Sequence, residues 1–371
     1  DIEAAGHHVV KLSIGEPDFG APPAVRASMR EVKDGRPLPY TAALGLPKLR
    51  ETIANYYLTK HGVTVDPARI AVTTGASGAL LLATAATTDP GDEVIIADPS
   101  YPCNRELVHT FGGTIVSLAT TADSRYQLDA RSVAAAWTDR TVAVMVASPS
   151  NPTGTSVSSE ELDAVCALAR SRGAWRIIDE IYLDLADPSV DGTPARTALA
   201  LDPDAIVIGS FSKYFGMTGW RLGWMVLPEP LVAPIEKLAM NYFLCASTPV
   251  QHAAVAAFSP ESIAVSEGRR EELRARRALV LDGLAALNLV VPVVPDGAFY
   301  VYFDVSSTGL DAWTFCERVL DEAHVALTPG RDFAQGTANS HVRLSYAASR
   351  DELTEGLRRL GHWLANLTTA A

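Results

Sequence analysis

Residues 210–221 of this chain read SFSKYFGMTGWR, and this stretch is the strongest indication of the fold in the sequence. The apolar run from Ala205 to Gly209 precedes it and predicts a buried strand that ends near Lys213. A lysine at the end of such a strand can be desolvated and kept neutral, and a neutral amine can form a Schiff base with an aldehyde. Two serine hydroxyls precede the lysine and Arg221 follows it, so the stretch can also hold an anion beside the amine.

On both sides of this stretch, apolar strand-like runs alternate with amphipathic helical patterns. Seven runs predict strands, at residues 70–74, 93–98, 114–118, 142–148, 176–179, 205–210 and 222–227. Strands that alternate with helices predict an α/β fold, in which a mostly parallel seven-stranded sheet lies between helices. Ligands of such sheets bind at the carboxyl ends of the strands, and most of the polar residues that could bind a ligand in this chain follow a predicted strand directly.

The character of the chain changes near Ser259. A long helix rich in Arg and Glu is predicted at 261–287, followed by strand-like pieces at 297–304 and 342–346. A chain of 371 residues also exceeds the size of a single hydrophobic core. We therefore expect a large domain at 31–260 and a smaller α+β domain formed by 1–30 and 261–371, with a short strand at 10–14.

Composition and charge exclude several classes of protein. The net charge of −12 argues against binding to nucleic-acid backbones, which favour a basic face. No apolar stretch approaches the roughly 20 residues that span a bilayer, and the N-terminus carries no signal-peptide pattern. The four cysteines are far apart and form no CxxC pair, which indicates reduced thiols. We expect a cytoplasmic protein with no metal site and no nucleic-acid or membrane partner.

Three predicted strands are followed by residues that could contact a flat, anionic ligand. The turn that contains Ala76 and Ser77 opens a helix, and its free backbone N–H groups form either an anion site or an ordinary tight turn. Tyr101 could stack on a flat cofactor or pack within a loop. Asn151 lies between two prolines, which present a rigid amide to a phenolate or a carboxylate, or simply form a turn.

Two further positions carry charges that need partners. Asp179 ends a buried strand, where a carboxylate is costly unless a cation such as a protonated ring nitrogen is beside it. Tyr182 follows three residues later and could face the same side. Arg343 lies within an apolar strand-like run, so it binds either a substrate carboxylate or a structural acidic partner.

Taken together and in this order, these segments resemble the class I/II aminotransferases, pyridoxal-phosphate enzymes of fold type I. The bacterial subgroup that holds aspartate aminotransferases is the most similar. The resemblance runs nearly from end to end, and the 210–223 stretch is its most specific part. The segments that carry it are 15–19, Tyr40, 45–50, 151–154, 179–182, 210–223, 297–300 and Arg343.

The resemblance implies pyridoxal 5′-phosphate as the cofactor and assigns residues to its ring. Lys213 would form the Schiff base with the cofactor and move the proton, and Asp179 would keep the pyridine nitrogen protonated. Asn151 and Tyr182 would bind the phenolate oxygen, and Tyr101 would stack on the ring.

The resemblance also assigns the phosphate and the substrate. The residues implied for the phosphate are Ala76, Ser77, Ser210, Ser212 and Arg221, with Tyr40 reaching in from the neighbouring subunit of a homodimer. Arg343 would bind the α-carboxylate of the substrate, helped by Asn151 and by the backbone near Gly15. The implied reaction is ping-pong transfer of an amino group from an L-amino acid to a 2-oxo acid.

One departure from the family pattern affects the expected substrate. Aspartate-using bacterial members often carry a lysine where this chain has Ser77, and that lysine helps to bind the side-chain carboxylate. Phe299, Tyr300, Tyr101 and the 240–243 stretch suggest an apolar rim. We therefore expect alanine-, valine- or aromatic-type donors rather than aspartate.

The same residues also fit other reactions and other classes of protein. A β-lyase, decarboxylase or racemase would use the same lysine and aspartate, because the protein selects which Cα bond breaks. A non-catalytic sensor domain of a transcription regulator is disfavoured, because the enzyme-like pattern begins by about Leu12 and the chain is acidic. Ser210-x-x-Lys213 also matches an acyl-enzyme serine motif, but its Ser-Asp-Asn and Lys-Thr-Gly partners do not follow.

Overall fold

The computed structural model describes residues 2–32, 34–35, 37–188 and 195–369. Its largest element is a seven-stranded sheet in the order β2-β8-β7-β6-β5-β3-β4. The strands are β2 (Ile70–Thr73), β3 (Glu93–Asp98), β4 (Thr114–Ala119), β5 (Thr141–Ala147), β6 (Trp175–Asp179), β7 (Ile206–Ser210) and β8 (Gly223–Val226). β8 runs antiparallel to both of its neighbours, β2 and β7, and the other pairs of the sheet are parallel. The predicted α/β fold is confirmed, and each predicted strand end lies within one residue of the observed end.

Both faces of this sheet are buried, because alternate residues of each strand enter different apolar clusters. Ala143 and Met145 of β5 pack on one face with α3 (Gly75–Thr87), α4 (Pro102–Thr110) and α7 (Glu229–Phe243). Val144 and Val146 pack on the other face with α2 (Pro47–His61), α5 (Ala130–Ala136) and α6 (Ser159–Ser171). Strands buried on both sides explain the continuous apolar runs in the sequence.

A smaller antiparallel sheet follows in the order β11-β12-β9, formed by β9 (Tyr300–Asp304), β11 (Thr328–Pro329) and β12 (His341–Ser345). β1 (Val10–Lys11) pairs in parallel with β10 (Val325–Ala326), so the start of the chain joins its C-terminal part. The expected strand at 297–304 begins only at Tyr300, because Ala298 adopts a left-handed backbone with φ of 55°. The division of the chain into domains at residues 30 and 260 stays a prediction.

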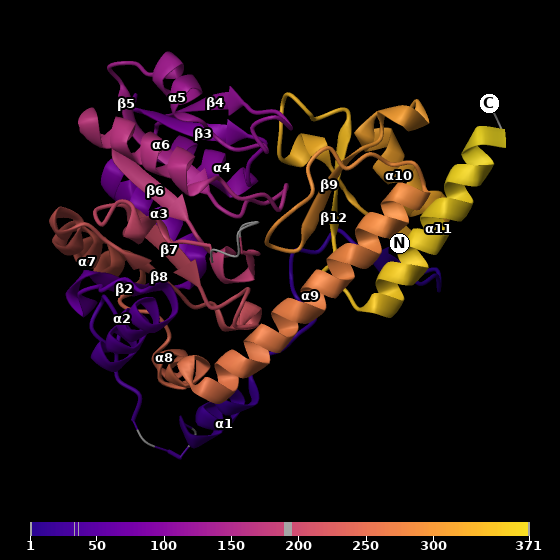
Figure 1. Ribbon diagram of the computed structural model, residues 1–371. Helices are drawn as coiled ribbons and strands as arrows, with labels where there is room; N and C mark the ends of the chain where they lie inside the picture. The colour runs from indigo at the N-terminus through magenta and orange to yellow at the C-terminus, as the bar shows by residue number, and fades with distance from the viewer. Residues whose placement is uncertain (1, 33, 36, 189–194, 370–371) are drawn as a thin grey trace.

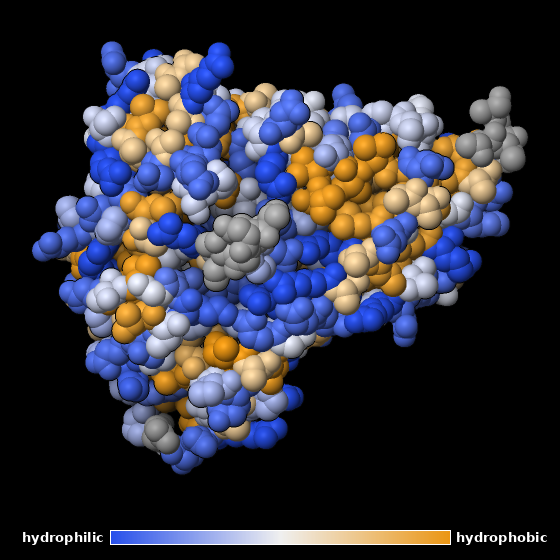
Figure 2. Space-filling model, in the orientation of Figure 1, coloured by the Kyte–Doolittle hydropathy of each residue, from blue (hydrophilic) through white to orange (hydrophobic). Residues whose placement is uncertain are grey.

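The remaining helices are α1 (Pro23–Val32), α8 (Thr248–Ala254), α9 (Pro260–Ala286), α10 (Ala312–Ala323) and α11 (Arg350–Thr369). Figure 1 shows α9 running from α8, beside the large sheet, to α10 and α11, beside the smaller one. Hydrophilic side chains dominate along the lower half of α9 in Figure 2, whereas apolar ones gather above its upper half, around β9 and α10. None of the helices in the described part of the chain combines the length and the apolar character needed to cross a membrane.

Candidate active site

A cavity of about 340 Å³ lies at the carboxyl ends of the central strands. The ends of β5, β6 and β7 line it together with the first turn of α3, while the smaller sheet and the N-terminal segment supply the other side. The sequence-predicted residues that line it are Gly15, Ala76, Ser77, Tyr101, Asn151, Asp179, Tyr182, Ser210, Ser212, Lys213, Arg221 and Arg343. Tyr40 is not among the lining residues and is 78% exposed.

Asp179 is the last residue of β6 and is buried. Its Oδ1 accepts a hydrogen bond from the backbone N–H of Ile181 at 3.1 Å. Burial raises the pKa of the carboxyl to about 6, against the opposing effects of that hydrogen bond and of the Lys213 charge. Because burial disfavours the isolated charge, this carboxylate favours a cationic group placed in the cavity beside it.

Lys213 lies three residues beyond β7, and its ammonium is held among backbone and aromatic rings. Nζ donates to the carbonyl oxygen of Gly15 at 2.7 Å and lies 5.8 Å from the ring centre of Tyr182 and 5.6 Å from that of Phe299. Burial lowers the pKa of the amine to about 8, and the cationic Arg221 and Arg343 act in the same direction. The amine is therefore partly neutral near physiological pH, the form that attacks a carbonyl carbon.

The N-terminus of α3 forms an anion cradle. Gly75 has φ of 75°, and a Cβ added there would lie 2.7 Å from a terminal nitrogen of Arg221. Arg221 therefore lies directly over the first turn of the helix, which presents free N–H groups at its positive end. Ser210 and Ser212 are buried beside it, and the Ser210 hydroxyl accepts from the backbone N–H of Ser212 at 3.0 Å. This combination suits a phosphate.

Arg343 of β12 is buried, and no carboxylate pairs with it within the described residues. One terminal nitrogen donates to Asn151 Oδ1 at 2.8 Å, and the other donates to the carbonyl oxygen of Ser13 at 2.6 Å. The guanidinium lies 4.6 Å from the ring centre of Tyr300 and 4.7 Å from that of Phe333, and no described residue forms a hydrogen bond with its buried Nε. A planar cation held this way lacks the anion that its fork geometry fits.

Sequence reasoning missed several lining residues: Leu80, Ala147, Pro149 and Ile181, together with the polar role of Tyr300. Tyr300 was expected only on an apolar rim. Its hydroxyl instead lies 2.9 Å from that of Tyr182, deep in the cavity, and a Cβ at Gly15 would lie 2.5 Å from it. The 297–300 segment marked this position, but nothing in the sequence showed that its tyrosine would meet Tyr182.

A sequence profile described as Aminotransferase class I and II matches residues 7–360 of the chain. The chain belongs to this family. As a class I and II aminotransferase, it is 40% identical over 358 residues to the valine–pyruvate aminotransferase of Mycobacterium tuberculosis, which covers 96% of this chain and 91% of the relative. The aspartate/prephenate aminotransferase of Thermus thermophilus is 36% identical over 366 residues, with 98% and 93% covered.

A crystal structure of an aminotransferase from Mycobacterium tuberculosis matches the fold with a TM-score of 0.93. That match has 39% identity and covers 98% of this chain and 94% of the other. The relatives are named for transamination, so the lyase, decarboxylase and sensor alternatives are not favoured. This aminotransferase is an enzyme that depends on pyridoxal 5′-phosphate, as its family does. The anion cradle at α3 and the buried Asp179 fit the two charged ends of that cofactor.

Proposed function

We propose that this enzyme transfers an amino group between a neutral L-amino acid and a 2-oxo acid by a ping-pong mechanism. One observation carries the proposal: a single cavity brings together the partly neutral amine of Lys213, the buried carboxylate of Asp179 and Arg343, which has no acidic partner among the described residues. Bound in this cavity, pyridoxal phosphate supplies an electron sink for the substrate Cα.

The inner end of the cavity has the residues to hold the cofactor. Asp179 would keep the ring nitrogen protonated, because a buried carboxylate stabilises a cation beside it. Asn151 and Tyr182 would donate hydrogen bonds to the phenolate oxygen, and Tyr101 would stack on the ring. Ala76, Ser77, Ser210, Ser212 and Arg221 would hold the phosphate at the α3 cradle.

Lys213 moves the proton. Nζ would take the proton from the substrate Cα and give it back later in the transfer, a role that needs a pKa near the working pH. Arg343 holds the α-carboxylate with both terminal nitrogens, aided by Asn151 and by backbone near Gly15. Tyr300 and Phe333 keep water from the two faces of the guanidinium.

The charges of the cavity support a neutral donor. Among its described lining residues the cations are Lys213, Arg221 and Arg343, and each has a role that leaves none for a second carboxylate. Ser77 stands where aspartate-using members often carry a lysine. The relatives point to different substrates, since one is named for valine and pyruvate and another for aspartate and prephenate. The residues of the cavity therefore support a neutral donor.

We propose further that the enzyme is a cytoplasmic homodimer in which Tyr40 reaches the phosphate of the partner subunit. Tyr40, Met240, Tyr242 and Leu244 expose large apolar side chains, and burying these favours association. All four cysteines are free, which suits a reducing compartment.

The test is an absorption spectrum of the purified protein with pyridoxal phosphate, titrated with a panel of amino acids. A band at the violet edge of the visible that a neutral amino acid bleaches and a 2-oxo acid restores is the expected result. A fastest response to aspartate or glutamate would overturn the neutral-donor assignment, and a band that no amino acid changes would overturn transamination. Sedimentation of the same sample tests the dimer.

A further inference from the structure

The two groups proposed to hold the substrate carboxylate belong to different sheets. Asn151 follows β5 of the seven-stranded sheet, whereas Arg343 lies on β12 of the smaller sheet. The hydrogen bond between them measures 2.8 Å. The position of each relative to the other therefore depends on how the two sheets are fastened near the cavity.

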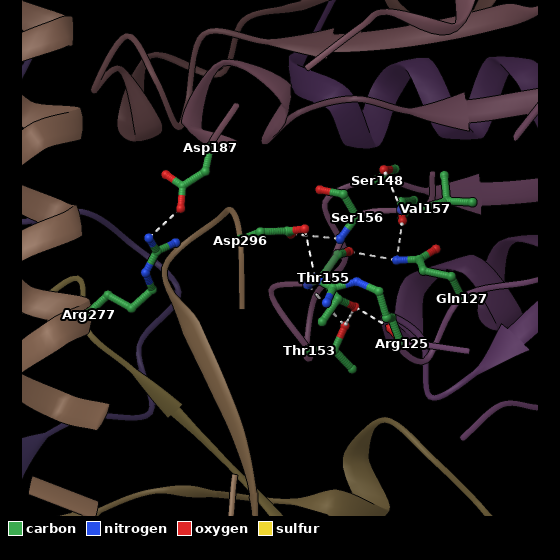
Figure 3. A network of polar contacts seen from close by, with 11 residues as sticks. Arg125, Gln127, Ser148, Thr153, Thr155, Ser156, Val157, Asp187, Arg277 and Asp296 are labelled. Atoms are coloured by element: carbon green, nitrogen blue, oxygen red, sulfur yellow. Dashed lines mark hydrogen bonds and ion pairs between the residues drawn. The ribbon is translucent and has the colours of Figure 1, made fainter. Parts of the chain in front are cut away.

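Asp296 lies just before β9, next to the turn that carries Asn151. The backbone N–H groups of Asp296 and Gly297 both donate to the carbonyl oxygen of Gly154, at 3.0 and 2.9 Å. Oδ1 of Asp296 accepts from the backbone N–H of Ser156 at 2.8 Å. Figure 3 shows the carboxylate pointing at this turn, so one residue binds the turn through both its backbone and its side chain.

The other oxygen of the same carboxylate ties in a third segment. Oδ2 of Asp296 accepts from a terminal nitrogen of Arg125 at 2.8 Å. The backbone of Arg125 in turn accepts from the Thr155 hydroxyl at 2.6 Å, and Gln127 donates to the Thr155 carbonyl at 2.6 Å. The turn after Asn151 is thus held from both sides, and Asp296 is the residue of the segment leading into β9 whose side chain binds it.

Asp187 extends the network to α9. Its backbone N–H donates to the carbonyl oxygen of Asp296 at 2.6 Å, and its carboxylate accepts from Arg274 Nε at 2.7 Å. Arg277 contacts the same carboxylate (Figure 3). Asp296 therefore lies where the turn after Asn151 and the long helix are both fastened to the start of the smaller sheet.

The turn after Asn151 and the segment that leads into β9 cross so closely that two glycines have no space for a side chain. Gly154 has φ of 67°, and a Cβ there would lie 2.6 Å from the carbonyl oxygen of Tyr300. A Cβ at Gly297 would lie 2.3 Å from Cγ of Pro149. Because Pro149 and Tyr300 line the cavity, a change in the backbone position at this crossing would displace the cavity wall.

We propose that Asp296 is a positioning residue for substrate binding, which sets the separation of Asn151 and Arg343 by fastening the start of β9 to the turn after Asn151. It lines no part of the cavity and acts through these two residues. The proposal rests on the proposed function, in which Arg343 and Asn151 hold the α-carboxylate. The ion pair between Asp296 and Arg125 is half exposed and contributes little to holding the turn. We therefore expect the hydrogen bond from the Ser156 N–H to Asp296 to account for most of the positioning effect.

The test compares L-alanine with ethylamine, which is the same amine without the carboxylate. Single-turnover absorbance changes of the pyridoxal-phosphate enzyme give an apparent Kd and a rate constant for each compound. Asp296→Ala is expected to raise the apparent Kd for L-alanine about tenfold and to leave the ethylamine reaction unchanged, because only the carboxylate contacts are displaced. The inhibition constant of propionate, a carboxylate that cannot react, is expected to rise in parallel.

Asp296→Asn keeps an oxygen for Ser156 and loses the charge toward Arg125, so it is expected to restore most of the affinity for L-alanine. If the alanine variant does not fold, a small loss of affinity for L-alanine in the asparagine variant, with ethylamine unchanged, supports the positioning role, and a loss with neither compound or equally with both overturns it. Asp282→Ala, at an exposed aspartate of α9, is the matched control and is expected to behave as the wild type. Equal losses with L-alanine and ethylamine, or no loss with either, would overturn the positioning role. Arg343→Ala distinguishes a failure of the proposed function, because an unchanged preference for L-alanine over ethylamine in that variant would remove the carboxylate assignment itself.

Discussion

The inner and outer sides of the cavity are built in different ways. The inner side comes from one sheet, where β6 ends in Asp179 and β7 ends in Ser210, three residues before Lys213. The outer side joins segments that are far apart in the chain, at Gly15, Tyr300 and Arg343. Hydrogen bonds within one sheet fix the inner groups rigidly, whereas the outer groups depend on the contact between two sheets. On the proposed function, cofactor chemistry belongs to the rigid side and substrate choice to the composite side.

The largest loss is expected on the inner side from Lys213→Ala. Transamination should fall by roughly 10⁴-fold or more, because both the covalent attachment and the proton transfer depend on this amine. Steady-state turnover with the best donor of the panel measures it. Lys237→Ala, at an exposed lysine of α7, should keep full turnover. Near-normal turnover in the Lys213→Ala variant would contradict the proposed mechanism.

The next largest loss is expected from Asp179→Asn. An amide cannot balance a protonated ring nitrogen, and removing one partner of a buried charged pair costs about 3–5 kcal/mol, or roughly 200- to 5,000-fold in turnover. Glu180→Gln is the matched control, since Glu180 is buried next to Asp179 but accepts hydrogen bonds from Thr197 and the Ala198 N–H. That variant should lower the melting temperature and spare turnover. Equal turnover losses in the two variants would mean that Asp179 acts only in folding.

These two sides also differ in how far the sequence predicted them. Lys213 and Asp179 each follow an apolar run, and the ends of parallel strands meet at one edge of a sheet, so pattern alone brought them together. The hydrogen bond between Tyr182 and Tyr300 joins a residue that follows β6 of the large sheet to a residue on β9 of the smaller one, and no periodicity specifies such a contact. Asp296 was invisible for the same reason, because its partners Arg125 and Ser156 lie far away in the chain. Tyr40 stays a prediction, because its expected partner is a second copy.

On the outer side, Arg343→Ala is expected to weaken binding more than turnover. Loss of a bidentate, buried contact to the α-carboxylate should raise the apparent Kd of the amino acid about a hundredfold. Arg331→Ala, at an exposed arginine that stacks on Trp313, should leave that Kd unchanged. Half-reaction titrations of both variants give the values. The comparison of the two sides fails if the Arg343 variant loses turnover at saturation as severely as the Asp179 variant.

The smallest effect is expected where the two sides meet, at Glu16. Its carboxylate accepts from the Thr218 hydroxyl and raises the pKa of Lys213 against the larger, opposite effect of burial. Glu16→Gln should therefore lower the pKa of the amine below about 8. An amine reacts only when deprotonated, so its reactivity rises with pH through the pKa, and the midpoint of that rise should move to lower pH in the variant.

Reductive methylation of the cofactor-free protein by formaldehyde, quantified at Lys213 across pH, measures this midpoint without any turnover. Asp18→Asn, which removes a nearby carboxylate that is paired with Arg276, should leave the midpoint in place. A midpoint that moves upward in the Glu16 variant would show that Glu16 affects the pKa of Lys213 mainly through the burial of the amine and not through its own charge. The N-terminal segment, on the outer side of the cavity, would then set the environment of the amine on the inner side.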